Sequence, residues 1–129
     1  MAGRLLLDTS IIVDFRADDP AVKQGLDETD EVFVPSITVG ELLYGARISA
    51  RAEANRAKVE AFVAGNVVLN CDLRTGEHYA MIKAALRAKG RPIPENDIWI
   101  AAIALQHGLS IAARDEHFDA VDGLDVVEW

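Results

Sequence analysis

Apolar residues in this chain fall alternately into short continuous runs and into stripes with helical spacing. A short apolar run bounded by turn residues is typical of a buried strand, and apolar residues at i, i+3, i+4 and i+7 are typical of an amphipathic helix. Val39, Leu42, Leu43 and Ala46 form such a stripe. The apolar runs predict strands at 4–7, 31–34, 67–70, 109–112 and 125–128.

Polar and glycine residues mark where the helices between these strands begin and end. Ser10, Ser36 and Asn96 are of the types that cap helix N-termini. Gly90 and Gly108 are suited to helix C-termini, where a left-handed residue often follows the last turn. The helices are predicted from residue 11 to the break at 18–20, over 20–27, from 37 to about 46, and over 51–64, 75–89 and 97–107.

Strands that alternate with helices predict an α/β domain in three layers, with a mostly parallel central sheet flanked by helices. The 129 residues contain no repeat, low-complexity segment or linker, so we predict a single domain over 1–129. The apolar run Leu5–Leu7 is too short for a signal-peptide core, and no stretch approaches the roughly 20 apolar residues that span a bilayer. We therefore expect a cytoplasmic protein with no membrane association.

The charge of the chain gives little support to a nucleic-acid enzyme. The formal net charge is −8, whereas phosphate binding favours lysine and arginine. Basic residues gather in two stretches, 47–58 and 83–91, which are most simply interpreted as solvated helix faces. Cys71 is the single cysteine, which excludes an internal disulfide and a cysteine-rich zinc site. Function must therefore be judged from a candidate site.

Four carboxylates occupy positions where such a site is expected. Asp8 ends the first predicted strand and Asp115 follows the fourth, so both are expected at the ligand-binding edge of a parallel sheet. Glu41 interrupts the apolar side of its helix, and Asp97 opens the most apolar helix of the chain. Carboxylates brought together raise each other's pKa, and a hard cation such as Mg²⁺ or Mn²⁺ relieves the repulsion. A metal held in this way can activate water for phosphodiester hydrolysis.

Each acid also has a purely structural interpretation. Asp8 can cap the helix that follows it, and Asp97 can favour the positive end of its helix. Glu41 can be a solvated helix residue, and Asp115 can belong to a polar turn. The metal-site hypothesis therefore depends on the order and the apolar settings of all four acids together.

The acids lie in four segments that together extend over nearly the whole chain. These segments are Leu6–Val13, Ser36–Ala46, Pro94–Ala102 and Gly108–Phe118. In content and order they resemble the PIN-domain proteins, and specifically the VapC toxins of bacterial toxin–antitoxin pairs.

The resemblance implies a PIN-like fold and a magnesium-dependent endoribonuclease that acts as a growth-inhibiting toxin. It also implies an RNA substrate, a cognate VapB-type antitoxin that blocks the site, and a homodimer. By position, the acids of the family correspond to the four named above, of which Asp8 and Asp97 match the best-established metal ligands. The supporting polar neighbours correspond to Thr9, Ser10 and Asn96.

One position departs from the family pattern. The family often has threonine or serine two residues before the fourth acid, and here that residue is Ala113. A hydroxyl that can orient a carboxylate is therefore missing, which bears on the rate and not on the ligand set.

Three other function classes require residues that this chain lacks. A haloacid-dehalogenase-type phosphoryl-transfer enzyme requires an acid where Ser10 stands, and a metal-dependent adhesion module requires serine where Ile12 stands. A receiver domain requires a lysine late in the chain, and no lysine follows Lys89. A PIN-like interaction module without catalysis remains an alternative.

Histidine chemistry is not predicted. His78, His107 and His117 share no metal-ligand spacing, and no histidine–aspartate pair marks Ser10 as a triad nucleophile.

Overall fold

The computed structural model describes residues 3–129, so the first two residues of the predicted domain lie outside the described part. Its centre is a five-stranded sheet in the order β3-β2-β1-β4-β5, and every neighbouring pair of strands is parallel. The strands are β1 (Arg4–Leu7), β2 (Glu31–Pro35), β3 (Val67–Leu69), β4 (Ser110–Ala112) and β5 (Val126–Val127). The α/β class and the parallel sheet predicted from the sequence are confirmed.

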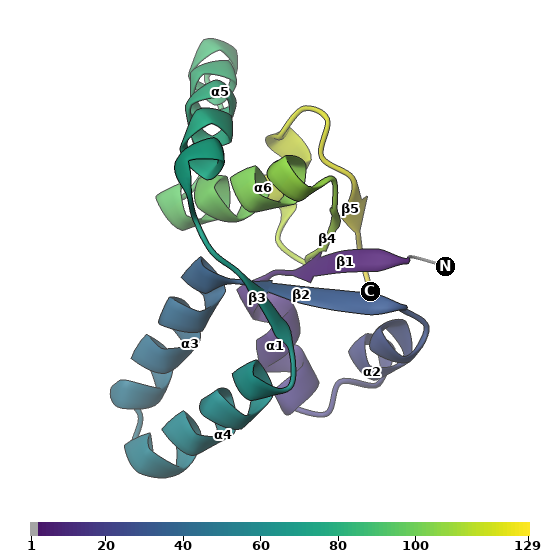
Figure 1. Cartoon of the computed structure of the whole chain (residues 1–129), viewed down its shortest axis with the longest axis vertical. Helices are drawn as coiled ribbons and strands as arrows, with labels where there is room; N and C mark the ends of the chain where they lie inside the picture. Colours follow the sequence, from purple (N-terminus) through teal and green to yellow (C-terminus); the bar gives the residue numbers. More distant parts are fainter. Residues whose placement is uncertain (1–2) are drawn as a thin grey trace.

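Helices cover both faces of this sheet (Figure 1). Helices α1 to α4 lie on one side of it, and α5, α6 and a short 3₁₀ helix lie on the other. Their bounds are α1 (Thr9–Arg16), α2 (Pro20–Asp27), α3 (Ser36–Arg47), α4 (Ala52–Ala64), α5 (Leu73–Lys89), α6 (Glu95–His107) and η1 (Glu116–Ala120). Within residues 3–129, none of these helices is both long enough and apolar enough to cross a membrane.

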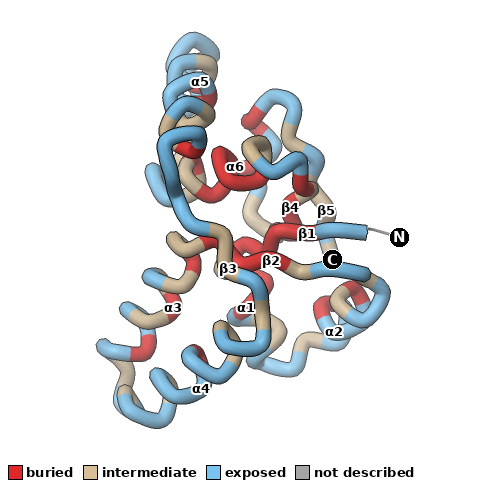
Figure 2. The backbone as a smooth tube through the Cα atoms, in the orientation of Figure 1, coloured by how far each residue is buried: buried red, intermediate tan, exposed pale blue. Residues whose placement is uncertain are grey.

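Strand β1 supplies side chains to two separate cores. Successive side chains of a strand point to opposite faces. Leu5 and Leu7 accordingly pack with α1 and α3, whereas Leu6 packs with α6. All three leucines are fully buried, as expected for the middle strand of a covered parallel sheet. Figure 2 shows the buried residues concentrated in β1, β2, β4 and α6. The strand thus fixes the position of the residue that follows it, Asp8.

The predicted helix starts are wrong in detail. Ser10, Ser36 and Asn96 were expected at N-cap positions, but the helices begin one or two residues earlier, and Asp8, Pro35 and Pro94 occupy the cap positions without a side-chain cap. The residue before the first turn of a helix has an extended backbone. Proline favours this conformation, so it can occupy the position as well as serine can. Gly90 and Gly108 are left-handed C-caps, as predicted.

The end of the chain packs against α2 at a glycine. A Cβ atom built on Gly25 would lie 2.2 Å from the ring of Trp129. The carbonyl oxygen of Trp129 in turn accepts a hydrogen bond of 2.9 Å from Nε of Arg114. The glycine therefore provides the space that this indole ring occupies.

We predict that Gly25→Ala lowers the free energy of unfolding by about 1–3 kcal/mol, the usual cost of overpacking. Gly76→Ala is the matched control, because Gly76 is also a helical glycine and has open space at its Cβ position. Gly76→Ala is expected to stabilise by about 0.5–1 kcal/mol through its helix propensity. Urea denaturation measures both changes, and an equal effect of the two substitutions would contradict the packing role of Gly25.

Candidate metal centre

A hollow of about 350 Å³ collects the four predicted acids at the carboxyl edge of the sheet. Each acid comes from a different element, and all four line this one hollow together with Thr9 and Ser10. The acids are Asp8 after β1, Glu41 in α3, Asp97 in the first turn of α6 and Asp115 before η1. The exception among the predicted residues is Asn96, which is exposed and is not part of the lining.

Asp8 lies deepest and is only 5% exposed. Its backbone N–H donates to the carbonyl of Ala112 at 3.0 Å, which continues the pairing of β1 with β4. Its carboxylate accepts a hydrogen bond of 2.9 Å from the hydroxyl of Ser10. Burial raises the pKa of Asp8, and the nearby carboxylates of Asp97 and Glu41 raise it further, while the Ser10 hydroxyl opposes the rise.

Glu41 is held through the threonine beside Asp8. The hydroxyl of Thr9 donates to Oε1 of Glu41 at 2.7 Å and lies 3.1 Å from the hydroxyl of the fully buried Thr38. Thr38 and Glu41 are both in α3, so these contacts connect α3 to the start of α1. A solvated helix residue would make no such contacts, and this argues against the purely structural interpretation of Glu41.

Asp97 and Asp115 are connected by a histidine that the sequence did not single out. Nδ1 of His117 lies 2.9 Å from Oδ2 of Asp97 and 2.9 Å from Oδ1 of Asp115. One ligand atom from each of these three residues falls within 4.8 Å of the others, a grouping that can hold a metal ion. The sequence offers only the two-residue spacing of Asp115 and His117 as a signal, and in the structure the carboxylate of Asp115 accepts the backbone N–H of His117 at 3.0 Å.

Asp97 has the second perturbed carboxyl group of the hollow. Burial raises its pKa, and the carboxylates of Asp115 and Glu41 add to the rise, while the hydrogen bond with His117 lowers it. Because four negative groups gather around one space, the protein without a cation stores repulsion there. Oxygen ligands in this number suit Mg²⁺ or Mn²⁺, so the side chains fit a divalent cation.

Asp14 is a fifth acid in the lining, but its charge is already compensated. Its Oδ2 lies 3.1 Å from Nη1 of Arg114, which also contacts Oδ2 of Asp19 at 2.7 Å. This ion-pair network connects the end of β4 to α1 and to the start of α2. Asp14 is therefore better explained as part of a structural contact than as a metal ligand.

Ala113, the departure from the family pattern, is buried within the core on the α6 side and is 1% exposed. Its backbone N–H donates to the carbonyl of Val127 at 3.1 Å. Ala113 thus contributes to the core, and the orientation of Asp115 is left to the backbone and ring of His117.

Comparisons with known proteins agree with this architecture. The PIN domain family model matches residues 5–124. The tRNA(fMet)-specific endonuclease VapC of Shigella flexneri is 33% identical, with 98% of each chain covered, and Ribonuclease VapC2 of Haemophilus influenzae has the same identity and coverage. Among solved structures, DNA-bound VapBC from Salmonella typhimurium superimposes with a TM-score of 0.90 at 30% identity, covering 98% of both chains.

We predict that Asp8→Asn raises the stability of the metal-free protein at pH 7 by on the order of 1 kcal/mol, because it removes a charge that burial and the neighbouring carboxylates of Asp97 and Glu41 disfavour. The pKa of Asp8 is higher in the folded than in the unfolded state, so the folded wild type gains stability as the pH falls through the folded pKa. The gain in stability of the variant over the wild type should therefore be full at neutral pH and should disappear on acidification. Thermal melts in EDTA from neutral to acid pH measure this difference in stability. A stability gain of the variant that grows toward acid pH would contradict the prediction.

Proposed function

The chain belongs to the PIN domain family and is related to the VapC ribonucleases over nearly its full length, and from this premise we propose that it is a magnesium-dependent endoribonuclease. The observation that carries the proposal is the convergence of the four carboxylates around one hollow. We further propose that the chain is a single PIN domain and acts as the toxin of a toxin–antitoxin pair.

Asp8 and Asp97 are proposed as the principal ligands of the cation, with Glu41 and Asp115 completing the site. Mg²⁺ is the expected ion, and Mn²⁺ is the alternative. A divalent cation held there supplies the Lewis acidity that activates water and offsets the charge of a phosphodiester in the transition state. No histidine or covalent nucleophile is required for this chemistry.

The residues around the acids are proposed to orient them. Ser10 fixes one carboxylate oxygen of Asp8, and Thr9 fixes one of Glu41. His117 contacts the facing oxygens of Asp97 and Asp115, which holds these two side chains near one another. These hydrogen bonds hold the carboxylates in fixed orientations, and such preorganisation favours electrostatic catalysis.

We predict that the purified protein cleaves RNA with Mg²⁺ or Mn²⁺ and not in EDTA. Asp8→Asn and Asp97→Asn should each lower the rate by at least about a hundredfold, since each removes a charged ligand. Asp119→Asn is the matched control, because Asp119 is an exposed acid outside the hollow. Equal cleavage in EDTA would contradict the mechanism, and a folded wild type without cleavage would favour the interaction module.

The partners of solved relatives support an antitoxin for this chain. The Salmonella typhimurium structure and the 2.2 Å structure of VapBC-1 from nontypeable Haemophilus influenzae are both described as VapBC. We propose a VapB-type antitoxin that places an arginine or lysine in the acidic hollow, because clustered carboxylates attract such cations. A homodimer is proposed for the toxin on the family resemblance.

We predict that the cognate antitoxin abolishes RNA cleavage, and that replacing its inserted basic residue with alanine weakens the inhibition about tenfold or more. Cleavage assays with increasing antitoxin measure this. Full cleavage in the saturated complex would show that the antitoxin does not block the site.

A further inference from the structure

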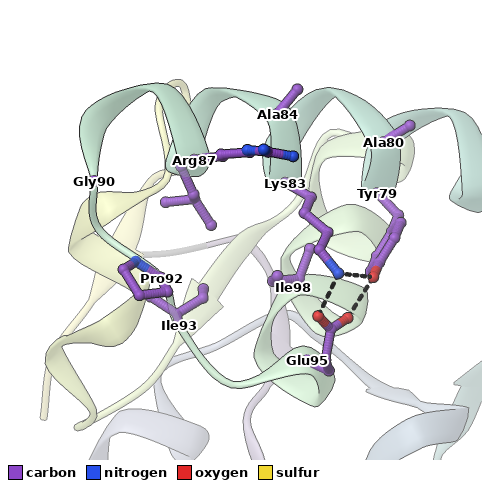
Figure 3. Close-up of a pocket in the computed structure, with 11 residues that line it drawn as sticks. Tyr79, Ala80, Lys83, Ala84, Arg87, Gly90, Pro92, Ile93, Glu95 and Ile98 are labelled. Carbon is purple, nitrogen blue, oxygen red and sulfur yellow. Dashed lines mark hydrogen bonds and ion pairs between the residues drawn. The ribbon is translucent and has the colours of Figure 1, made fainter.

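A second and larger pocket lies between α5, the start of α6 and the segment that connects them (Figure 3). Its volume is about 680 Å³, within the usual range of small-molecule sites of about 300–1,000 Å³. Its walls are mainly apolar and include Leu86, Pro92, Ile93 and Ile98. No residue that lines this pocket also lines the catalytic hollow, so the two are separate sites.

One end of the pocket carries an ordered polar group. Nζ of Lys83 contacts Oε1 of Glu95 at 2.6 Å and the hydroxyl of Tyr79 at 3.1 Å, as the dashed lines in Figure 3 mark. A lysine ammonium has three donors, so one remains available to a ligand. Tyr79 also stacks on Trp99, with ring centroids 4.0 Å apart, which fixes its position.

Arg87 adds a positive charge that the fold leaves without compensation. It lines the same pocket one helical turn beyond Lys83 and is exposed. Among residues 3–129 it takes part in none of the ion pairs. An apolar cavity beside such a guanidinium matches a ligand that combines a flat apolar group with an anion, which describes a nucleotide.

The catalytic hollow has the opposite charge. Its lining includes five acids and neither lysine nor arginine, so the polyanionic backbone of RNA must find its basic contacts elsewhere. Helix α6 connects the two sites, because Glu95 at the pocket is two residues before Asp97 in the hollow. Two residues correspond to about 3 Å along a helix axis. Because side chains two residues apart leave opposite sides of a helix, the pocket and the hollow border different sides of the first turn of α6. A strand bound at Asp97 reaches the pocket by crossing this turn, whose diameter is about 10–12 Å.

We propose that this pocket receives a nucleobase of the RNA substrate that flanks the scissile phosphate, with Arg87 contacting a neighbouring phosphate and Lys83 contacting the same nucleotide. The inference rests on the proposed ribonuclease function and adds to it a substrate-binding subsite outside the acids. The base is held by burial of its apolar face, and the arginine supplies the electrostatic part of the affinity.

Two substitutions separate these contributions. Ala84→Trp fills the pocket from an exposed position of α5, and Arg87→Ala removes the charge. Ala88→Trp and Arg74→Ala are the matched controls, since both residues are exposed on the same helix and neither lines the pocket. Binding is measured by fluorescence anisotropy in the Asp8→Asn background, with a short fluorescein-labelled single-stranded RNA of mixed sequence.

The filled pocket should weaken RNA binding about tenfold, within the range for the loss of one stacked base. Arg87→Ala should weaken binding about fivefold and should reduce the slope of log K against log salt by about one. In the cleavage-competent protein, both should raise KM and leave kcat nearly unchanged. The two controls should bind and cleave as the parent protein does.

The possible failures are distinct. If the wild type cleaves no RNA with Mg²⁺ or Mn²⁺, the proposed function is wrong and this inference with it. If the wild type cleaves, but both pocket variants bind RNA as tightly as their controls, only the inference is overturned. Sedimentation velocity tests whether a second copy of the chain occupies the pocket instead. If Ala84→Trp changes the oligomeric state and leaves RNA affinity intact, a second copy covers the pocket and the RNA subsite is refuted.

Discussion

Four mutually repelling carboxylates held at one edge of a parallel sheet are the constraint on which the rest of this structure depends. Strand β1 is buried on both faces and pairs with β4 so that Leu7 lies opposite Ala112. This register sets the backbone of Asp8 beside the strand end that leads to Asp115. The apolar cores on the two faces stabilise the fold against this repulsion. Burial of the leucines of β1 is favourable and offsets the unfavourable burial of a charge at the end of the strand.

The polar contacts of the site follow from the same constraint. Ser10 and Thr9 each neutralise part of the field of one acid by donating a hydrogen bond, and His117 lies between two more. Arg114 forms an ion pair with the fifth acid, Asp14, and so compensates its negative charge. The basic residues Lys83 and Arg87 lie on α5, outside the hollow, so the RNA contacts proposed for them leave the charge of the acids unchanged.

The sequence predicted the elements and the four acids better than it predicted local contacts. Apolar runs and stripes record burial directly, so the strands and helices were placed within a few residues. Helix starts were less predictable, because Pro35 and Pro94 occupy cap positions where serine and asparagine compete as candidates. The role of His117 depends on the 3₁₀ turn after Asp115 and on the approach of α6 from a distant part of the chain, neither of which leaves a periodic pattern. Asn96 is adjacent to Asp97 in sequence, yet the rotation of the helix excludes it from the hollow.

The most direct test of the central claim is the position of the cation itself. Crystals of the wild-type protein grown with Mn²⁺ and measured at the manganese absorption edge should give an anomalous peak in the hollow. We predict a peak at coordination distance, about 2.0–2.2 Å, from carboxylate oxygens of both Asp8 and Asp97. A manganese ion bound only by Asp97, Asp115 and His117, or no peak in the hollow at saturating Mn²⁺, would contradict it.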